Sequence, residues 1–402
     1  MKNTAISLIA AAIVFCGCGS KQQKTEKATD DITVACYYFP NYHPGDPRNE
    51  TFKGKGWSEW ELVKAAKPRF PGHNQPIVPA WGYTDEKDPK EMERKIRVAS
   101  DHGIDAFIFD WYMYEDGPFL NRCLDEGFLQ AKNVEQLKFG LMWANHDWAD
   151  GHPYKKGVSA EILYSGVVSP KRYEEICDHL VEKYFTQPNY LLIDGKAYFS
   201  VYHIKLFVQN FGSIEATRRA MDLLREKAKA AGLKGVHWNI VIWGNPVLPV
   251  DEQPDNVEEM ISAIGFDSFT TYVWMQHANL PDLQTDYNNV RDQYFEYWDK
   301  ADTYALPYHP NITMGWDVTP RCDPDAEWEH GTYPYTNTMG NNTPENFKLA
   351  LQMSKEKILA NPISPRIISI NCWNEWTEGS YLEPDTRNGM GYLEAVRDIF
   401  GN

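Results

Sequence analysis

The chain has no run of lysines and arginines, although 24% of its 402 residues are charged. Proteins that bind a nucleic-acid duplex or a phosphate-rich membrane surface need clustered cations. The formal net charge is −16 instead. We therefore expect no nucleic-acid partner, and the acidity favours a neutral or basic ligand.

Metal-binding patterns of cysteine and histidine are also missing. Beyond residue 18 no CxxC pair or zinc-type Cys/His spacing occurs. Five cysteines remain there, too widely scattered to demand a disulfide, and two of them fall inside predicted strands, which favours buried thiols. We expect no metal and no cofactor. These cysteines are Cys36, Cys123, Cys177, Cys322 and Cys372.

Long apolar runs are confined to the N-terminus, where residues 5–15 are too few to span a bilayer. Lys2 precedes this run, and a small residue before Cys18 resembles a bacterial lipobox. We expect a signal peptide over residues 1–17, lipidation at Cys18 and a polar tether over 18–31. Such a protein is an exported lipoprotein, periplasmic or on the cell surface, held to the outer membrane only by its lipid. A plain secretory signal is the alternative.

From residue 32 onward, short apolar runs alternate with amphipathic stretches. Continuous apolar runs are typical of strands covered on both faces. Eight such units predict a single-domain α/β fold over 32–402, a (β/α)8 TIM barrel with long βα loops. A doubly wound sheet with a second domain is the rival, weakened because no glycine-rich phosphate loop follows the first strand. The expected strands are 32–39, 105–110, 137–143, 197–202, 235–243, 266–272, 312–316 and 366–373.

Helices are expected between these strands. Asp88, Ser169 and Thr343 each precede a proline, which is the pattern of a capping side chain followed by proline at the first helical position. These signals predict helices over 88–103, 169–184 and 343–359. Amphipathic stretches predict three more, over 214–231, 286–300 and 391–400.

Aromatic residues are abundant, with 14 Trp, 23 Tyr and 18 Phe. They could fill a large core or pave a cleft for sugar rings. They recur beside carboxylates, amides and imidazoles at the predicted strand ends, where a barrel builds its active site. We therefore expect a ligand cleft at this rim. The candidate substrate-binding residues are Tyr38, His43, Asp110, Trp111, Trp143, Asn145, His146, Asp147, Tyr202, Trp243, Tyr272, Trp316, Asn374 and Trp376.

Two glutamates close the eighth strand, Glu375 and Glu378, and a helical turn would place them on one side. Glycoside cleavage needs one carboxyl that protonates the leaving oxygen and another that acts as nucleophile or base. Crowding two carboxyls raises the pKa of one and so divides these roles. The alternative is a pair of solvated glutamates on a surface turn.

Several stretches resemble the WbsX-type proteins related to glycoside hydrolase family 99. They are NCWNEWTEGSYLEPD at 371–385, YYFPNYHP at 37–44, GWSEWELVKAAKPRFPGHNQP at 56–76, HGIDAF at 102–107 and WANHDW at 143–148. The resemblance implies a (β/α)8 barrel that cleaves within α-mannosides or related glycans with net retention. It implies Glu375 as the base on the sugar's own 2-hydroxyl and Glu378 as the general acid.

Two departures bear on the substrate and reaction. The family pattern often has Asn-Glu-Asn where this chain has Asn145-His146-Asp147, so the substrate can differ. The WbsX name also comes from polysaccharide biosynthesis loci, where members are labelled glycosyltransferases. No Asp-x-Asp stands out as a nucleotide-sugar or metal-binding signature, and an exported anchor is remote from cytoplasmic sugar nucleotides. Hydrolysis of an oligo- or polysaccharide is therefore the favoured reaction; glycosyl transfer and non-catalytic glycan binding are the alternatives.

Other polar residues have weaker signals. His43, His146 and His203 with two aspartates could bind a metal, but their spacing matches no metal signature, so hydrogen bonding to sugar hydroxyls is favoured. Glu59 and the tryptophans around it lie in the long loop after the first strand, where they either cap the cleft or fasten the loop. The sequence leaves the sugar, the linkage and the oligomeric state open.

Overall fold

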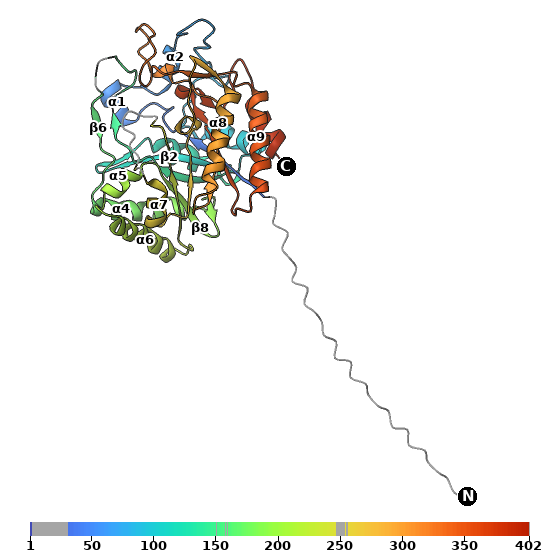
Figure 1. Ribbon diagram of the computed structural model, residues 1–402. Coiled ribbons are helices and arrows are strands. Elements are labelled where there is room, and N and C mark those ends of the chain that lie inside the picture. Colours follow the sequence, from blue (N-terminus) through green and yellow to red (C-terminus); the bar gives the residue numbers. More distant parts are fainter. Residues whose placement is uncertain are drawn as a thin grey trace. The chain divides into compact units, whose positions relative to one another are not determined.

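Nine short parallel segments form a barrel in this computed structural model, which describes residue 1 and residues 31–401 apart from 150, 157, 159, 247–253 and 255 (Figure 1). They pair in the order β12, β10, β9, β8, β4, β2, β1, β15, β13. Parallel pairing brings all carboxyl ends to one mouth of the barrel. The segments are β1 (Thr33–Tyr38), β2 (Ala106–Tyr114), β4 (Lys138–Trp143), β8 (Lys196–Val201), β9 (Val236–Val241), β10 (Ser268–Thr270), β12 (Tyr308–His309), β13 (Asn311–Thr313) and β15 (Ile367–Asn371).

The barrel closes through its seventh strand, which Pro310 divides into β12 and β13. β12 pairs with β10, and β13 pairs with β15. Proline has no N–H for the ladder, but the Pro310 carbonyl oxygen accepts from Ser369 N at 2.9 Å. The predicted eight-stranded barrel is thus confirmed, and the rival open sheet is excluded. The seventh strand begins earlier than its predicted range of 312–316, because Pro310 interrupts its first half. It also ends earlier, since Trp316 and its neighbours leave the sheet to bond rim loops.

Helices surround the barrel, and the six predicted ones are present. The Asp88, Ser169 and Thr343 side chains accept from backbone N–H groups of the first turn, as expected of capping residues. The helix predicted to reach residue 184 continues past α4 as a π turn, η4 (Val181–Phe185). The α-helices are α1 (Pro47–Lys53), α2 (Trp60–Ala65), α3 (Pro89–Asp101), α4 (Pro170–Leu180), α5 (Ile204–Gln209), α6 (Ile214–Ala230), α7 (Val257–Ile264), α8 (Tyr287–Ala301), α9 (Pro344–Ala360) and α10 (Gly391–Phe400).

Short elements decorate both ends of the barrel and were not predicted, because segments of two to five residues carry no readable period. The strands are β3 (Gly117–Phe119), β5 (Trp148–Ala149), β6 (Ile162–Tyr164), β7 (Leu192–Ile193), β11 (Gln284–Asp286), β14 (Thr338–Gly340), β16 (Asn374–Glu375) and β17 (Ser380–Tyr381). The tight turns are η1 (Cys123–Gly127), η2 (Phe128–Gln130), η3 (Val134–Gln136), η5 (Trp274–Gln276), η6 (Thr319–Arg321) and η7 (Trp376–Glu378).

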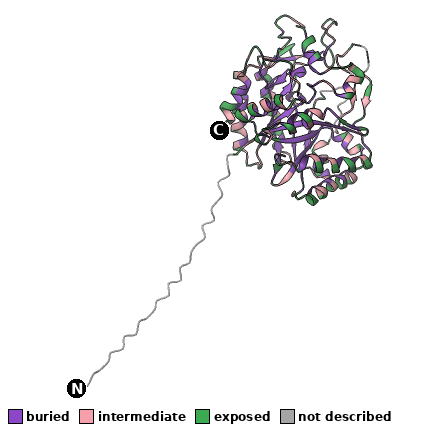
Figure 2. Cartoon of the chain, turned by 180° about the vertical axis from the view of Figure 1, so that it is seen from behind, coloured by how far each residue is buried: buried purple, intermediate pink, exposed green. Residues whose placement is uncertain are grey.

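The core takes most of the aromatic residues. Ten of the 14 tryptophans are buried, and Figure 2 shows buried residues along the strands with exposed ones on the outer helix faces. The composition therefore reflects core packing first. The five cysteines that the structure describes are buried free thiols.

The expected signal peptide, lipidation site Cys18 and tether fall on residues 2–30, outside the described residues, except for Asp31 at the end of the tether. Within the described part of the chain, no helix combines the length and the apolar character needed to cross a membrane.

Candidate active site

A tight hairpin presents the two glutamates at the barrel mouth. β16 and β17 pair antiparallel, with η7 between them. Gly379 ends this turn at φ 65°, and a Cβ there would lie 2.8 Å from the Asp317 Cβ. Only glycine fits both constraints. The Asn374 side chain fastens the hairpin to the loop after β1, accepting from Phe39 N at 2.9 Å and donating to Phe39 O at 2.7 Å.

A buried charge network supports the hairpin from beneath. Lys95 Nζ lies 2.6 Å from both Glu86 Oε1 and Glu383 Oε1, and all three side chains are almost fully buried. Glu383 also accepts the indole N–H groups of Trp373 at 3.0 Å and Trp376 at 2.8 Å. Because each carboxylate is paired with Lys95, this network is a rigid base for the turn.

Arg321, at the end of η6, joins the two glutamates. Its Nη2 donates to Glu375 Oε1 at 2.7 Å, and its Nη1 donates to Glu378 Oε1 at 2.5 Å. Nη1 also donates to Tyr333 Oη at 2.7 Å, while Nε donates to Thr377 Oγ1 at 3.1 Å. The planar guanidinium therefore fixes both carboxyl groups relative to each other.

A third carboxyl group lies beside this pair. Glu59 Oε1 is 3.1 Å from Thr377 Oγ1 and 4.0 Å from Arg321 Nε. The same Thr377 hydroxyl is 3.2 Å from Glu375 Oε1. Burial raises the pKa of Glu59, although Arg321 opposes the shift. The Glu59 carboxyl thus shares one hydroxyl and one cation with Glu375.

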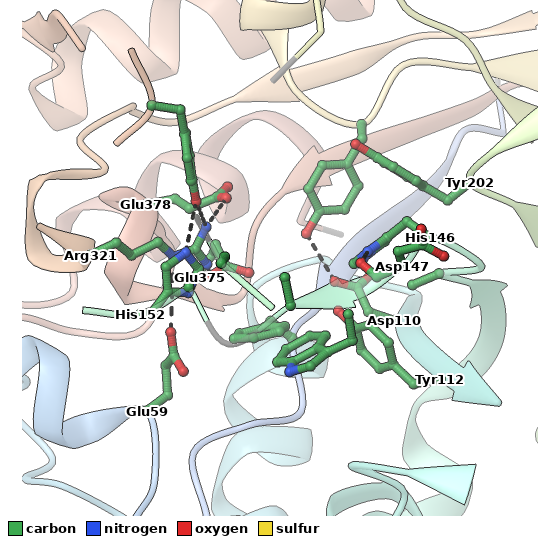
Figure 3. Close-up of a pocket in the computed structure, with 18 of the residues that line it drawn as sticks. Glu59, Asp110, Tyr112, His146, Asp147, His152, Tyr202, Arg321, Glu375 and Glu378 are labelled. Carbon is green, nitrogen blue, oxygen red and sulfur yellow. Dashed lines mark hydrogen bonds and ion pairs between the residues drawn. The ribbon is translucent and has the colours of Figure 1, made fainter. Parts of the chain in front are cut away.

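Asp110 faces this group from the opposite side of the cavity (Figure 3). Its Oδ2 accepts from Tyr272 Oη at 3.0 Å, and its Oδ1 accepts from no described residue. Burial raises the pKa of Asp110 well above its ordinary value, and the charge of Glu378 adds to the rise. Asp110 therefore offers a buried, partly unsatisfied carboxyl oxygen to a ligand.

Burial also raises the pKa of Glu375 well above its ordinary value, and Glu378 adds to the rise while Arg321 opposes it. One cation cannot offset the several carboxyls that surround Glu375. The ionised carboxylate of Glu375 is consequently a stronger base than an ordinary glutamate.

The cavity between these groups has a volume of about 400 Å³. Carboxyl groups and rings line it together, the combination that sugar recognition uses. Its further lining side chains include Phe39, Tyr112, His146, Asp147, Trp148, His152, Tyr154, Tyr202 and Tyr333.

Comparison with known proteins identifies the family. The family model described as "Glycosyltransferase WbsX" matches residues 34–396. The chain belongs to the WbsX family. The protein WxcX of Xanthomonas campestris pv. campestris, described as uncharacterised, is 28% identical to this WbsX-family protein over an alignment of 381 residues. The match covers 91% of this chain and 49% of WxcX. The chain thus spans about half the length of the curated relatives it matches.

Solved structures share the fold of this WbsX-family protein. A GH99 endo-α-mannosidase from Bacteroides thetaiotaomicron superposes with a TM-score of 0.53 at 16% identity, covering 92% of this chain and 96% of that one. A glycoside hydrolase-like protein superposes with a TM-score of 0.57 at 13% identity, covering 93% and 95%. At these identities the likeness shows the barrel architecture.

Seven of the predicted site residues line the cavity. Glu375 and Glu378 meet there with candidate substrate-binding residues from four other strand ends. These candidates are Asp110, His146, Asp147, Tyr202 and Tyr272. Among them, Asp147 also holds its own loop, since its Oδ1 accepts from Gly166 N at 2.7 Å.

The other predicted binding residues lie outside this lining and pack within the fold. Tyr38 Oη donates to Glu86 at 2.8 Å, and the Asn145 side chain ties two strand ends by bonding His203 N and O. A polar residue directly after a strand can either bind a ligand or join two loops. The sequence pattern is the same in both cases, so it does not distinguish the two roles. The residues outside the lining are Tyr38, His43, Trp111, Trp143, Asn145, Trp243, Trp316, Asn374 and Trp376.

The long loop after β1 fills both roles that the sequence left open. Trp60 fastens the loop, since its indole N–H donates to Thr84 O at 2.8 Å, whereas Glu59 reaches the cavity. Arg321, His152 and Tyr333 were missed, because they lie in loops without a strand signal. The one sequence signal for Arg321 is that a cation follows the predicted seventh strand, whose expected range ends at Trp316.

Two weaker sequence signals concern a metal ion and a nucleotide sugar. Within the described ranges no cluster of three or more His, Cys, Asp or Glu side chains could hold a metal ion. One Asp-x-Asp tripeptide does occur, Asp323-Pro324-Asp325, but Asp323 Oδ1 accepts from Asp325 N at 2.9 Å and Asp325 pairs with Lys67 at 3.1 Å. This tripeptide forms a surface turn.

Proposed function

We propose that this WbsX-family protein is a glycoside hydrolase that cleaves an oligo- or polysaccharide. The observation that carries the proposal is the position of Glu375 and Glu378 on adjacent nitrogens of Arg321, beside an aromatic-lined cavity at the barrel mouth. A pair of carboxyls flanking a sugar-sized cavity is what glycoside cleavage requires.

In this proposal Glu378 protonates the leaving oxygen. Glu375, once ionised, either removes the proton of the sugar's 2-hydroxyl, so that the 2-oxygen displaces the leaving oxygen at the anomeric carbon, or displaces it directly. Water then opens the anhydro sugar or the glycosyl-enzyme, and either path ends in net retention. A raised pKa suits Glu375 to this task, because a more basic carboxylate takes a hydroxyl proton more readily. Arg321 holds the two carboxyl groups at a fixed separation while the protons are transferred.

An α-mannosidic or related linkage is the proposed target. Its support is the family resemblance of the hairpin together with the shared barrel architecture of the Bacteroides endo-α-mannosidase. The carboxyl-rich lining also favours a neutral sugar over an acidic one, since Glu59, Asp110, Glu375 and Glu378 outnumber the Arg321 cation.

The decisive experiment is product analysis with α-mannans and other bacterial and host glycans. We expect released sugars from the parent chain, and a fall of about 10²–10⁴-fold for Glu378→Gln. Glycan binding should survive in that variant, because the amide keeps the carboxyl's shape. Binding without product from any glycan would instead identify a non-catalytic glycan-binding protein.

Glycosyl transfer is the second candidate, favoured by the description of the matching family. A transferase would consume an activated sugar donor and would not release sugar to water. Incubating the chain with nucleotide-activated and lipid-activated sugars, with and without an acceptor glycan, separates the two reactions.

We further propose that the chain is an exported lipoprotein anchored through Cys18. Metabolic labelling with a fatty-acid analogue tests this, with Cys18→Ser as the unlabelled control. Labelling of both forms, or of neither, would reject the anchor.

A further inference from the structure

A second cavity, of about 240 Å³, lies behind the acid-bearing turn. Among the described residues its lining has none in common with the first cavity. Glu378 lines the first cavity, and the next residue, Gly379, lines the second together with Asp317, whose N–H donates to Glu378 O at 2.6 Å. A single turn of chain therefore separates the two spaces.

Loops after the first, seventh and eighth strands build this second cavity. Trp316 follows β13, Asn342 precedes α9, and Asn388 lies between β17 and α10. Gln284 on β11 closes another side. TIM barrels frequently bind a phosphate in this corner, so the kind of ligand has to be decided from the polar groups that are present.

Several donors in this cavity have no internal partner. The Trp316 indole N–H, the Asn74 and Gln284 amides and the Arg387 guanidinium form no hydrogen bond or ion pair with any described residue. Asn74, Gln284 and Arg387 are exposed, so their donors are free to bond a ligand that enters the cavity.

Acceptors are available beside these donors. Asn388 donates its amide to Asp385 Oδ2 at 2.8 Å, and Asn342 donates to Met314 O at 3.4 Å. Each therefore has a side-chain oxygen that accepts from no described residue. An anion only accepts hydrogen bonds, whereas a hydroxyl both donates and accepts. The mixture of groups matches a polyhydroxylated ligand.

The charge of the wall also disfavours an anion. Asp317 lines the cavity, and hydrogen bonds from His73 at 2.8 Å and Gln75 at 2.7 Å reach its Oδ2. Although burial opposes the shift, these partners hold the pKa of Asp317 below its ordinary value. The carboxylate is thus charged at neutral pH and offsets Arg387, the one lysine or arginine among the described residues of this lining.

We propose that this second cavity is a non-catalytic binding site for one neutral monosaccharide unit of a glycan. The choice of a sugar rests on the proposed function. Trp316 lines the cavity with little exposed area, so recognition rests on the unpaired amide donors and amide oxygens, which bond the sugar hydroxyls. A glycan held here and in the first cavity engages both sides of the acid-bearing turn.

Saturation-transfer NMR on the full chain tests the site. The probes are the methyl glycosides of mannose, glucose, galactose and N-acetylglucosamine. Inorganic phosphate, which has no carbon-bound protons, is the anion probe and is followed by phosphorus NMR line broadening. All titrations use the Glu378→Gln background, so that binding is measured without turnover. Asn74→Ala with Gln284→Ala removes two exposed donors, Trp316→Phe removes the indole N–H, and Arg97→Ala on α3 is the matched surface control.

We expect at least one glycoside to bind, with an affinity that falls tenfold or more when the three donor changes are combined and stays constant in Arg97→Ala. The Asn74→Ala, Gln284→Ala pair alone should give part of this loss without touching the core. Glycoside binding that none of these changes alters overturns the proposal, as does binding of phosphate alone. Product analysis of the parent chain judges the proposed function separately.

Discussion

Arg321 donates from Nη2 to Glu375 Oε1 at 2.7 Å, and this bond links a loop after the seventh strand to the hairpin after the eighth. Because Nη1 of the same guanidinium reaches Glu378, the separation of the two carboxyls is set by a rigid planar group. The geometry of the proposed acid and base therefore depends on a residue that performs no proton transfer itself.

Replacing Arg321 by lysine keeps the charge and removes the fork. We expect kcat/KM on a cleaved glycan to fall about 10²–10³-fold, as when one preorganised donor is lost. Arg97→Lys on the surface should leave the rate unchanged. Equal activity of Arg321→Lys and the parent would contradict a positioning role for the guanidinium.

The raised pKa of Glu375 sets the acidic side of the pH profile. A base works only when ionised, so activity should rise with pH through the pKa of Glu375, well above the ordinary glutamate value of about 4.3. Initial rates from pH 4 to 9 locate this limb. A rate that is already constant at pH 5 would show that Glu375 is not the group that must lose its proton.

We expect Asp110 to lower the free energy of unfolding at neutral pH. Its pKa is higher in the folded chain than in the unfolded one, so the folded state binds the proton more tightly. The free energy of unfolding then falls as pH rises from about 4 to the raised pKa. Asp110→Asn should gain about 1–3 kcal/mol at pH 7.5, and the gain should vanish near pH 4. Denaturant titrations at both pH values measure it.

Gly379 should tolerate no side chain. Alanine there bears the left-handed backbone cost of about 1–2 kcal/mol and also a clash with Asp317. Gly389, at φ 57° with no heavy atom within 4 Å of the place a methyl group would take, is the matched control that bears the backbone cost alone. We expect Gly379→Ala to be less stable than Gly389→Ala and to lose activity. Equal melting temperatures would contradict the close approach.

We expect Lys95 to be essential for the stability of the buried charge network beneath the hairpin. Methionine at this position leaves Glu86 and Glu383 buried without a cation, which costs about 3–5 kcal/mol. Lys90→Met, exposed on the same helix, should change little. Thermal unfolding compares the two variants, and similar stabilities would mean that the carboxyls are satisfied without Lys95.

The barrel was predictable because its signals are local. Apolar runs mark seven strands closely, and capping residues such as Asp88 and Thr343 mark helix starts. Glu375 and Glu378 were predictable for the same reason, since they lie three residues apart on one turn. The seventh strand was misplaced because Pro310 interrupts it, and a proline inside a strand argues against a strand.

The partners of the acid pair were not predictable, because they come from distant loops. Nothing local to Arg321 shows that it meets Glu378, 57 residues farther on, or that Tyr333 bonds the same guanidinium. Conversely, Asn145 has the position of a ligand-binding amide yet joins two loops. Direction of a side chain at a strand end is decided by tertiary packing, which a residue pattern does not encode.

The clamp between Asn374 and Phe39 spans 335 positions of the chain. The first and last strands of the barrel must therefore meet before the acid pair has its support. During synthesis the ribosome has to release almost every residue of the barrel before a competent pair can assemble. Chains still on the ribosome should consequently not cleave glycans. The moment at which activity appears would then report when the first and last strands of the barrel pair.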